Sequence, residues 1–316
     1  MCPYLALLLG AAALTVATLK TSRPDGTYLE VPKFRRMMFY IMPSRNESVV
    51  YFDRYVPADP LLAYLKSLPF DADITHAAVA AVGIGLAENP RMNQFVVGRR
   101  MYARNGRWLT FSMKRKFMDK EAKLSAVKLQ VQDGQTFREL SEAINGNIVV
   151  ERSGTKTAAD KEFDLLDFLP RPLLWGFSQL LRWLDYYNLL PGFFIEQDGM
   201  YTSAFVANLG SLKMGAGYHH LYEHGTCPLF IMLGQIEARP TVVDGEVKPV
   251  NTLHIRFSYD ERIADGLTAR DGIESVARVL SDPARWLNCA KEDGSDDRPL
   301  WPHGVKIVHG KVADEA

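Results

Sequence analysis

The stretch FSYDERIADG, residues 257–266, joins a predicted strand to a predicted helix. On its N-terminal side, apolar and polar residues alternate from residue 252 to residue 259, the period-2 pattern of a strand with one buried face. On its C-terminal side, TARDGIESVARVLSDP (residues 268–283) has the spacing of an amphipathic helix. The turn between these elements therefore holds Glu261, Asp265 and Gly266.

Further from this stretch, the sequence predicts an α/β domain. Strands are expected over residues 47–56, 201–209 and 228–236, and helices over 59–68, 73–90 and 136–145, the second of them apolar all round and so buried. Asn105-Gly106 and Asp244-Gly245 each predict a hairpin turn. YHHLYEHG, residues 218–225, is expected to be helical.

Composition limits the classes of function. The chain has 316 residues, 47% of them hydrophobic, and its 37 Lys and Arg balance its 37 Asp and Glu. No whole-chain field attracts nucleic acid or an anionic membrane, so anion binding must be local. Cys2, Cys227 and Cys289 are odd in number and lack C-x-x-C spacing, which argues against disulfides and a zinc ribbon and favours a reducing compartment.

The N-terminal segment predicts a membrane anchor. Residues 2–19 are uncharged and are followed by Lys20 and Arg23, and the positive-inside rule places the body of the protein in the cytoplasm. We expect an anchor over residues 1–22 at the inner face of the membrane, a domain over 23–290 and a loose polar tail over 291–316. A buried helix or a misassigned start is the alternative for residues 1–22.

A second apolar segment is expected to be buried against another surface. Residues 165–194, LLDFLPRPLLWGFSQLLRWLDYYNLLPGFF, are apolar on most of the helical circumference. A surface helix would show a polar half, so this segment is expected against the core, a partner chain or a membrane surface.

Three stretches together resemble a known family. Residues 239–283, with their DG hairpin, strand and DERIADG turn, resemble the C-terminal part of the catalytic domain of the 2-oxoacid dehydrogenase dihydrolipoamide acyltransferases, a fold shared with chloramphenicol acetyltransferase. AFVANLGSL (residues 204–212) resembles the T-I-S-N-L-G strand of that family, and residues 75–96 its apolar helix and following asparagine. Order and spacing agree, so the similarity spans residues 32–286.

The resemblance implies an α/β two-layer sandwich, a mixed sheet with helices on one side. It also implies homotrimers with active sites between subunits, sometimes built into cages, and acyl transfer with coenzyme A. The family's lipoyl domain, partner-binding domain and linkers are not present in this chain, so it carries no lipoyl group and a role as the core of a 2-oxoacid dehydrogenase is not implied.

The resemblance also assigns catalytic positions. The family's H-x-x-x-D-G histidine takes the proton from a thiol, its aspartate orients an arginine, and a serine of S-N-L-G holds the oxyanion. By position, Asp265 and Gly266 are kept together with Arg262, whereas Glu261 replaces the histidine and Ala207 replaces the serine. Of the retained residues, Asn208 and Gly266 are the cofactor-binding candidates.

Both replacements weaken the chemistry. A thiol with a pKa of about 8.5 is matched by an imidazole near 6.5, but a glutamate near 4.3 makes proton transfer roughly 5 to 6 kcal/mol uphill. Loss of an oxyanion donor costs roughly 3 to 4 kcal/mol more. We therefore expect weak or lost acyl transfer, or a substitute catalytic residue.

Histidines are the first candidates for a substitute general base. His219 and His220 follow the AFVANLGSL strand and so pass near the channel that the resemblance implies; a structural or surface histidine cluster is the alternative. If helical, His220 and His224 would share a face at the spacing of two metal ligands, but no third ligand is evident and no metal is assigned. Cys227 has no adjacent base to make it a nucleophile.

A basic run is the candidate phosphate site. Lys114, Arg115 and Lys116 stand where the resembled family has a Gly-rich connection, and they are expected to hold the phosphates of coenzyme A or acyl-CoA, a solvated strand end being the alternative. Two functions remain: an acyltransferase with a revised site, or a pseudoenzyme that serves as an oligomeric scaffold or binds acyl ligands.

Overall fold

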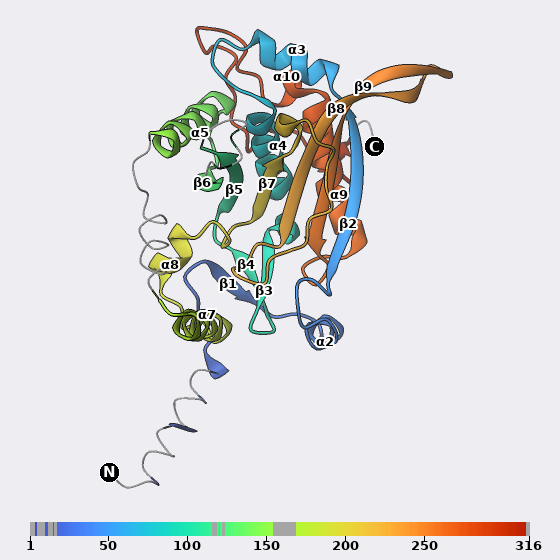
Figure 1. Ribbon diagram of the computed structural model, residues 1–316. Helices are drawn as coiled ribbons and strands as arrows, with labels where there is room; N and C mark the ends of the chain where they lie inside the picture. Colours follow the sequence, from blue (N-terminus) through green and yellow to red (C-terminus); the bar gives the residue numbers. More distant parts are fainter. Residues whose placement is uncertain are drawn as a thin grey trace.

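A six-stranded sheet forms the centre of the molecule. The computed structural model describes residues 18–115, 124–153 and 169–313, with the single positions 4, 10, 11, 15, 119 and 121. The sheet runs in the order β2, β9, β8, β7, β5, β6 (Figure 1). Its strands are β2 (Val49–Pro57), β5 (Arg107–Lys114), β6 (Leu124–Val131), β7 (Ala204–Asn208), β8 (Leu229–Val243) and β9 (Glu246–Asp260).

The sheet is mixed and has its long helices on one face. β7 is parallel to β5 and β8, and the other neighbouring strands are antiparallel. Helices α4 (Ile74–Glu88) and α9 (Gly266–Ser281) lie behind the sheet in Figure 1, with α3 (Asp59–Ser67) and α5 (Phe137–Arg152) near its upper end. The predicted two-layer α/β sandwich is confirmed.

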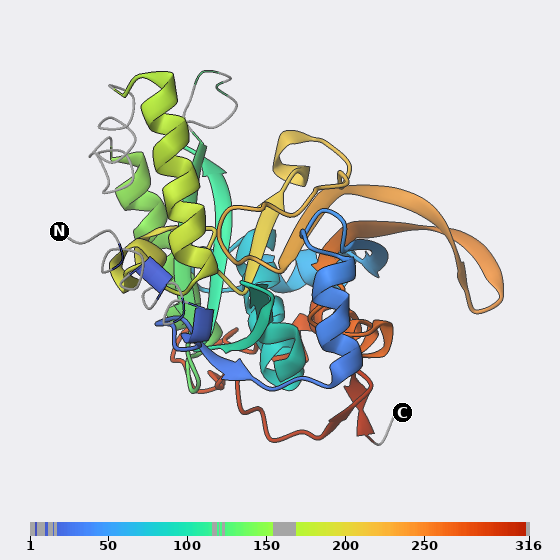
Figure 2. The same cartoon turned by 90° about the horizontal axis from the view of Figure 1, so that it is seen from below.

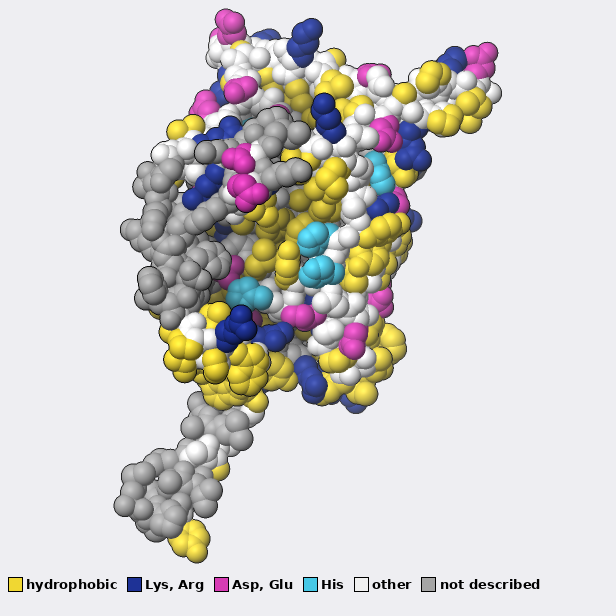
Figure 3. Space-filling view, viewed as in Figure 1, with side chains coloured by type: hydrophobic (Ala, Val, Ile, Leu, Met, Phe, Trp, Pro, Cys, Tyr) yellow, Lys and Arg dark blue, Asp and Glu magenta, His cyan; other side chains and the backbone are white. Residues whose placement is uncertain are grey.

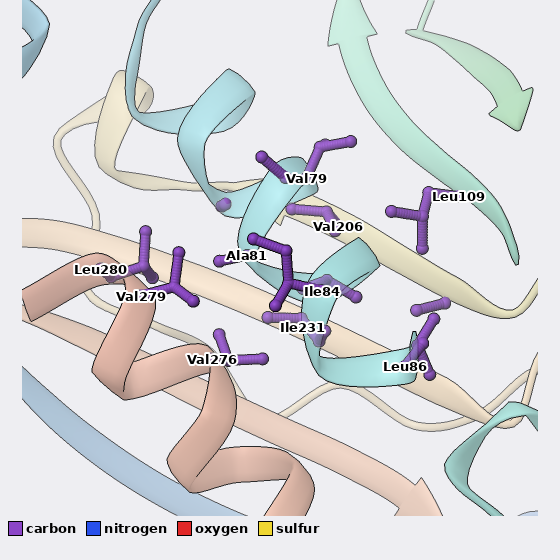
Figure 4. Close-up of a cluster of buried hydrophobic side chains, with 14 of the residues drawn as sticks. Val79, Ala81, Ile84, Leu86, Leu109, Val206, Ile231, Val276, Val279 and Leu280 are labelled. Atoms are coloured by element: carbon purple, nitrogen blue, oxygen red, sulfur yellow. The ribbon is translucent and has the colours of Figure 1, made fainter. Parts of the chain in front are cut away.

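The core lies between this face and α9. Residues 76–86 of α4 are all buried, as its all-round apolar sequence predicts, and Val79 and Ile84 pack against strand residues such as Val206 (Figure 4). A Cβ on Gly85 would come within 3.1 Å of Val276 on α9, so glycine permits the close approach of the two helices. Asp73 caps α4 by accepting from the Thr75 N–H at 2.7 Å.

The opposite face carries a smaller apolar cluster below the loop of residues 213–228. Phe205 and Ala207 of β7 and Phe230 and Met232 of β8 belong to it. Figure 3 shows hydrophobic and histidine side chains around a hollow on this face. The alternation predicted for β9 is confirmed, because its apolar residues 253, 255, 257 and 259 enter the main core while Arg256 and Ser258 face the loop.

The turn at Asn105-Gly106 differs from its prediction. These residues connect β4 (Arg100–Arg104) to β5, but β4 pairs with β3 (Gln94–Val97) and β1 (Gly26–Leu29) in a separate three-stranded sheet. The hairpin turn is instead Gly98-Arg99, both with positive φ. Gly106 has the positive φ that a tight turn needs, but the turn joins two strands of different sheets. Packing, and not the turn, determines which strand each one pairs with.

The C-terminal tail is packed rather than loose. After α10 (Pro283–Trp286), it buries Cys289 and Leu300, and Leu300 N–H donates to the Gln135 carbonyl at 2.8 Å. A short pair of strands, β10 (Ile307–Val308) and β11 (Lys311–Val312), follows. The expectation of a loose tail is therefore wrong for residues 291–313, because a few apolar residues among many polar ones are enough to attach it.

Three features project from this body. The β8–β9 hairpin extends beyond the sheet (Figures 1 and 2), and its turn is Asp244-Gly245, as predicted. At the lower end, α2 (Lys33–Ile41) and α7 (Arg171–Tyr186) lie on either side of the β3–β4 turn, and α8 (Gly192–Gln197) follows α7. Among the described residues, no helix is both long and apolar enough to cross a membrane. Most of the predicted anchor lies outside the described residues.

Candidate functional site

The turn after β9 places Glu261 and Asp265 at the start of α9. Asp265 is the N-cap residue, and its carboxylate accepts from the Thr268 N–H at 2.9 Å, a bond that lowers the pKa of Asp265. Glu261 is partly exposed, and its main-chain N–H donates to the Ser48 carbonyl at 2.9 Å. Within the described ranges, the Glu261 carboxylate has no hydrogen-bonding or ion-pair partner.

A buried ion pair fixes this turn. The Arg262 guanidinium donates to both carboxylate oxygens of Asp260, at 2.8 and 2.7 Å, and the two side chains are 4% and 0% exposed. Ser48 Oγ donates to the same carboxylate at 2.9 Å. Arg262 also donates to the Met42 carbonyl, so the turn is tied to the loop after α2.

The resemblance implies that Asp265 orients an arginine and does not say which one. Arg262 does not fit this role, because it is held by Asp260. Arg35 of α2 donates to the Arg262 carbonyl at 3.0 Å and is close enough to contribute to the lowered pKa of Asp265. Arg35 and Arg262 therefore both lie at this turn. In the described part of the chain, neither of them pairs with the Glu261 carboxylate.

Ala207 lies in apolar surroundings. It is buried in the second apolar cluster, next to Phe205 and opposite Met232 in the strand register. Its methyl group offers no hydrogen bond to an oxyanion. The adjacent Asn208 is already engaged, because its amide donates to Thr75 Oγ1 at 3.1 Å and accepts from the Ser211 N–H at 3.2 Å.

Within one chain, the two replaced positions lie far apart. Ala207 pairs in register with Met232, and Met232 with Arg256, which is five residues before Glu261. Five residues at about 3.3 Å and two strand spacings of about 4.8 Å separate Ala207 from Glu261 by about 19 Å. A site that used both positions would therefore draw them from two chains.

The histidine segment is not helical, which corrects its prediction. Residues 213–228 form a loop, and His220 and His224 therefore do not share a helix face. The His219 ring stacks on Phe230 with centroids 3.9 Å apart, and its Nδ1 lies 2.6 Å from the His220 carbonyl oxygen. Glycines at 210, 215 and 217 and the packing of the loop on β8 override the helical spacing.

This geometry defines a tautomer for His219. Burial lowers its pKa, so the ring is neutral near pH 7. Nδ1–H donates to the His220 carbonyl, which leaves the lone pair on Nε2. His220 likewise directs Nδ1 to the Leu221 carbonyl at 3.0 Å. The His219 ring lies on the same sheet face as Ala207, because its stacking partner Phe230 belongs to the same apolar cluster.

His224 belongs to a different environment. Its Nε2 lies 2.5 Å from Asp198, which raises the pKa of His224 and lowers that of Asp198. In the described part of the chain, no group of three His, Cys, Asp or Glu is placed to hold a metal ion. Burial raises the pKa of Cys227 to about 11, and its thiol donates to the Leu229 carbonyl, so it is a poor nucleophile.

The basic run is held by local contacts. Lys114 donates to the Asp119 carbonyl at 2.6 Å, and Arg115 donates to Ser125 and to Glu151. Lys116 lies outside the described residues. Gly266 is exposed, and a Cβ there would meet nothing within 4 Å, so packing inside the chain does not require glycine. Lys114 and Arg115 lie on the β5 side of the sheet, whereas Glu261 and Gly266 lie on the β9 side.

Two sets of residues were missed from the sequence. The Asp260–Arg262 pair had an available signal, since an aspartate that begins a turn commonly accepts from the main-chain N–H two residues on, as Asp260 does from Arg262 at 3.1 Å. The other set is four arginines, Arg45, Arg99, Arg182 and Arg262, that line a cavity of about 230 Å³. They come from separate segments, so no local pattern could have gathered them.

Comparisons with known proteins agree with the resemblance. Residues 199–288 match the family model described as the catalytic domain of the 2-oxoacid dehydrogenases acyltransferase. Over 82 residues, the chain is 29% identical to the dihydrolipoyllysine-residue acetyltransferase component of the pyruvate dehydrogenase complex of Bacillus subtilis. That segment is 26% of this chain and only 18% of the Bacillus protein.

Solved structures extend the likeness to most of the chain. A probable dihydrolipoamide acetyltransferase from Listeria monocytogenes has a TM-score of 0.53 at 14% identity, over 85% of this chain and 98% of that one. The dihydrolipoamide acetyltransferase of Azotobacter vinelandii, studied for a serine, a histidine and an asparagine in its catalytic mechanism, has a TM-score of 0.52 at 15% identity, over 84% and 98%. The predicted fold and family resemblance are confirmed.

Proposed function

We propose that this protein is a divergent, oligomeric acyltransferase-fold protein that binds coenzyme A thioesters and whose ordinary acyl transfer is weak or lost. The observation that carries the proposal is the pair of replacements in an otherwise retained frame. Glu261 supplies a carboxylate where the resembled family has a histidine, and Ala207 supplies a methyl group in an apolar cluster. The buried Asp260–Arg262 pair and the cap at Asp265 keep the turn in shape.

The chemical consequence follows from differential stabilisation of the transition state. A carboxylate is a weak base towards a thiol, and an alanine cannot donate to an oxyanion. The combined cost of roughly 8 to 10 kcal/mol is the sum of those two effects, and even half of it lowers a rate more than a thousand-fold. Thiol deprotonation and oxyanion stabilisation are therefore the two steps that we expect this chain to lack.

We propose a homotrimer, or a multiple of trimers, as the assembled form. Two observations support an oligomer. The separation of about 19 Å between Ala207 and Glu261 suits a site shared between chains. The β8–β9 hairpin extends beyond the sheet with Val242 and Val247 exposed, and a two-stranded hairpin is marginally stable without further cover. The family resemblance supports three as the number.

The phosphates of coenzyme A have two candidate sites. Lys114 and Arg115 already make local contacts, so binding there would require these contacts to rearrange. The arginine-lined cavity is the second basic site in the described ranges. We therefore propose that the protein binds a coenzyme A thioester, and we leave open which of these two sites holds its phosphates.

One observation favours the alternative of a revised active site. His219 is neutral and has its lone pair on Nε2, which is the state of a general base. It lies on the same sheet face as Ala207 and is tied to β9 through the hydrogen bond from Ser258 Oγ at 2.7 Å. In that case His219 or His220 would take the thiol proton that Glu261 cannot take.

A binding and turnover experiment separates these readings. Acetyl-CoA is titrated into the full chain in a calorimeter, and acetyl transfer to dihydrolipoamide is measured on the same sample. Binding without transfer supports the proposal. Transfer that is lost in both His219→Gln and His220→Gln but kept in His254→Gln supports the revised site. If the protein shows neither binding nor transfer, the thioester-binding proposal is overturned and the oligomeric scaffold remains.

Localisation is also a proposal. We place the protein in the cytoplasm, tethered to the inner face of the membrane by residues 2–19, on the basis of the uncharged segment and the basic residues after it. The position of the first described residues supports this. The Lys20 carbonyl accepts from Asn188 Nδ2 at 2.9 Å, so the segment joins the body beside the end of α7.

A further inference from the structure

A cavity of about 230 Å³ opens between six separate segments at the lower end of the molecule. It is lined by the last turns of α7, the β3–β4 turn, residues 223–225, the loop after α2, Tyr201 and Arg262. A Cβ on Gly98 would lie 2.2 Å from the Tyr186 carbonyl oxygen, so the β3–β4 turn packs directly on α7 and closes one side. The cavity is therefore part of the fold and does not depend on a mobile lid.

The lining carries an excess of positive charge. It contains four arginines and two carboxylates; Arg262 is paired with Asp260, and both carboxylates of the lining are engaged as well. Asp185 is paired with Arg23 at 3.1 Å, and Glu223 accepts from the Asn46 N–H at 3.0 Å. Arg99 and Arg182, in contrast, have no ion-pair partner among the described residues.

One buried arginine of the lining is incompletely satisfied. Arg45 is only 5% exposed, and its terminal nitrogens donate to the main-chain carbonyls of Val96, Tyr222 and Glu223 rather than to a carboxylate. Its buried Nε has no partner in the described part of the chain. A buried, unpaired donor is costly, and a bound anion would offset that cost.

Exposed apolar faces flank the cavity. On α2, Phe34, Met37 and Ile41 lie on one helix face and are 79%, 56% and 72% exposed. On α7, Trp175 and Trp183 are 68% and 46% exposed, and Leu173, Leu174 and Leu180 are exposed as well. Figure 3 shows hydrophobic side chains gathered at this end, with Lys and Arg side chains directly above them. Apolar and aromatic faces beside basic groups suit a helix at a bilayer interface.

The course of the chain favours a membrane over a dissolved anion. Residues 2–19 are uncharged, and the segment joins the body at Thr18 and Lys20, whose carbonyls accept from Arg100 and Asn188. Arg100 is adjacent to the β3–β4 turn and Asn188 follows α7. The junction at residues 18–20, the two apolar helix faces and the cavity therefore occupy one end of the molecule.

We propose that this cavity binds the phosphate headgroup of an anionic phospholipid while the exposed faces of α2 and α7 rest in the interfacial layer of the bilayer. Arg99 and Arg182 supply the donors nearest to solvent, and Arg45 supplies the buried charge. The site would add lipid selectivity to whatever affinity residues 2–19 provide. The cavity shares Arg262 with the turn that carries Glu261, but lipid binding there does not require acyl transfer.

Vesicle binding by the full chain tests the proposal. Co-sedimentation is measured with phosphatidylglycerol vesicles and with phosphatidylcholine vesicles, for the wild type and for Arg99→Gln with Arg182→Gln. Each basic side chain near an anionic surface strengthens binding roughly five-fold, so we expect the double variant to bind phosphatidylglycerol roughly 30-fold more weakly. Binding to phosphatidylcholine should stay unchanged, because residues 2–19 are intact.

A matched variant controls for net charge. Arg54→Gln with Arg270→Gln removes the same charge from exposed positions on β2 and α9 that do not line the cavity. This variant should keep the wild-type preference for phosphatidylglycerol. An equal loss in both double variants would show a general charge effect and overturn the site.

Two further measurements test whether something other than a lipid binds the cavity or covers the helix faces. Inorganic phosphate or coenzyme A that binds the wild type in calorimetry, with no vesicle preference, would show a site for a dissolved anion and overturn the lipid proposal. Phe34→Gln with Trp175→Gln should weaken binding to both kinds of vesicle. If it instead lowers the mass of the protein in solution, a second copy covers this face and the proposal is wrong.

Discussion

Asp260 and Arg262 form a buried ion pair with Nη2 and Oδ2 2.7 Å apart, on either side of Glu261 in the sequence. Because both partners point into the protein, the residue between them is the one that turns towards the surface. The frame around Glu261 is thus held by residues other than Glu261. This explains how the position can change from the histidine of the resembled family without loss of the turn.

We predict that Asp260→Asn destabilises the protein strongly. It leaves the Arg262 guanidinium buried without its counter-charge, which costs about 3 to 5 kcal/mol. Urea unfolding at one fixed protein concentration measures the change. The control is Asp133→Asn, whose carboxylate is 69% exposed beside Arg107 and should change the free energy of unfolding by less than about 1 kcal/mol. Equal effects would mean that the pair does not hold the turn.

The contact between His224 and Asp198 should make stability depend on pH. The hydrogen bond to Asp198 raises the pKa of His224 above its ordinary value of about 6.5. Its stabilisation is therefore fully present below about pH 6.5 and is lost as the pH rises through the raised pKa. The difference in unfolding free energy between wild type and His224→Gln should shrink from pH 5.5 to pH 9.

Asp198→Asn provides the matching control. It removes the negative charge but keeps an acceptor for the Met200 N–H, and NMR titration should then show a lower pKa for His224. A His224 pKa that is the same in wild type and Asp198→Asn would contradict this assignment.

The buried cysteines should be unreactive in the native protein. Burial raises the pKa of both Cys227 and Cys289 to about 11, so at pH 8 only about one thiol in a thousand is a thiolate. In a Cys2→Ser variant, a thiol reagent should modify neither cysteine within minutes, and should modify both after unfolding. Fast modification of Cys227 in the native state would reopen its role as a nucleophile.

The projecting hairpin should contribute to assembly. If it contacts a neighbouring chain, Val247→Lys places a charge in that contact and should lower the mass measured by light scattering from a multiple of three protomers towards one. Val149→Lys is the control, because Val149 is similarly exposed, at 68% against 71%, but lies on α5. A wild-type mass that is not a multiple of three would reject the trimer itself.

Much of the fold follows from local sequence patterns. The apolar run 74–88, with Asp73 before it and Pro90 after it, is a buried helix by composition and caps, and β9 follows from its alternation. The Asn105-Gly106 turn was placed correctly but its strands were paired wrongly, because a turn dipeptide specifies backbone geometry and not the sheet that each strand joins.

The site could be predicted only in part. Motif positions predict Glu261, Asp265 and Ala207, and the strand register adds that Ala207 and Glu261 are separated by about 19 Å in one chain at ideal strand spacings. The histidine segment has helical spacing but forms a loop, because a helix this short is marginal alone and His219 instead stacks on Phe230. The arginine cavity joins residues 45, 99, 182 and 262, a long-range arrangement that no sequence window contains.

The most direct test is the rate of acetyl transfer from acetyl-CoA to dihydrolipoamide, measured side by side for the wild type and for Glu261→His with Ala207→Ser. We predict a wild-type rate indistinguishable from buffer and a measurable rate for the double variant, because the base and the oxyanion donor are restored in an intact frame. A wild-type rate that saturates with acetyl-CoA and disappears in Glu261→Gln would contradict the proposal, since Glu261 would then be a working catalytic residue.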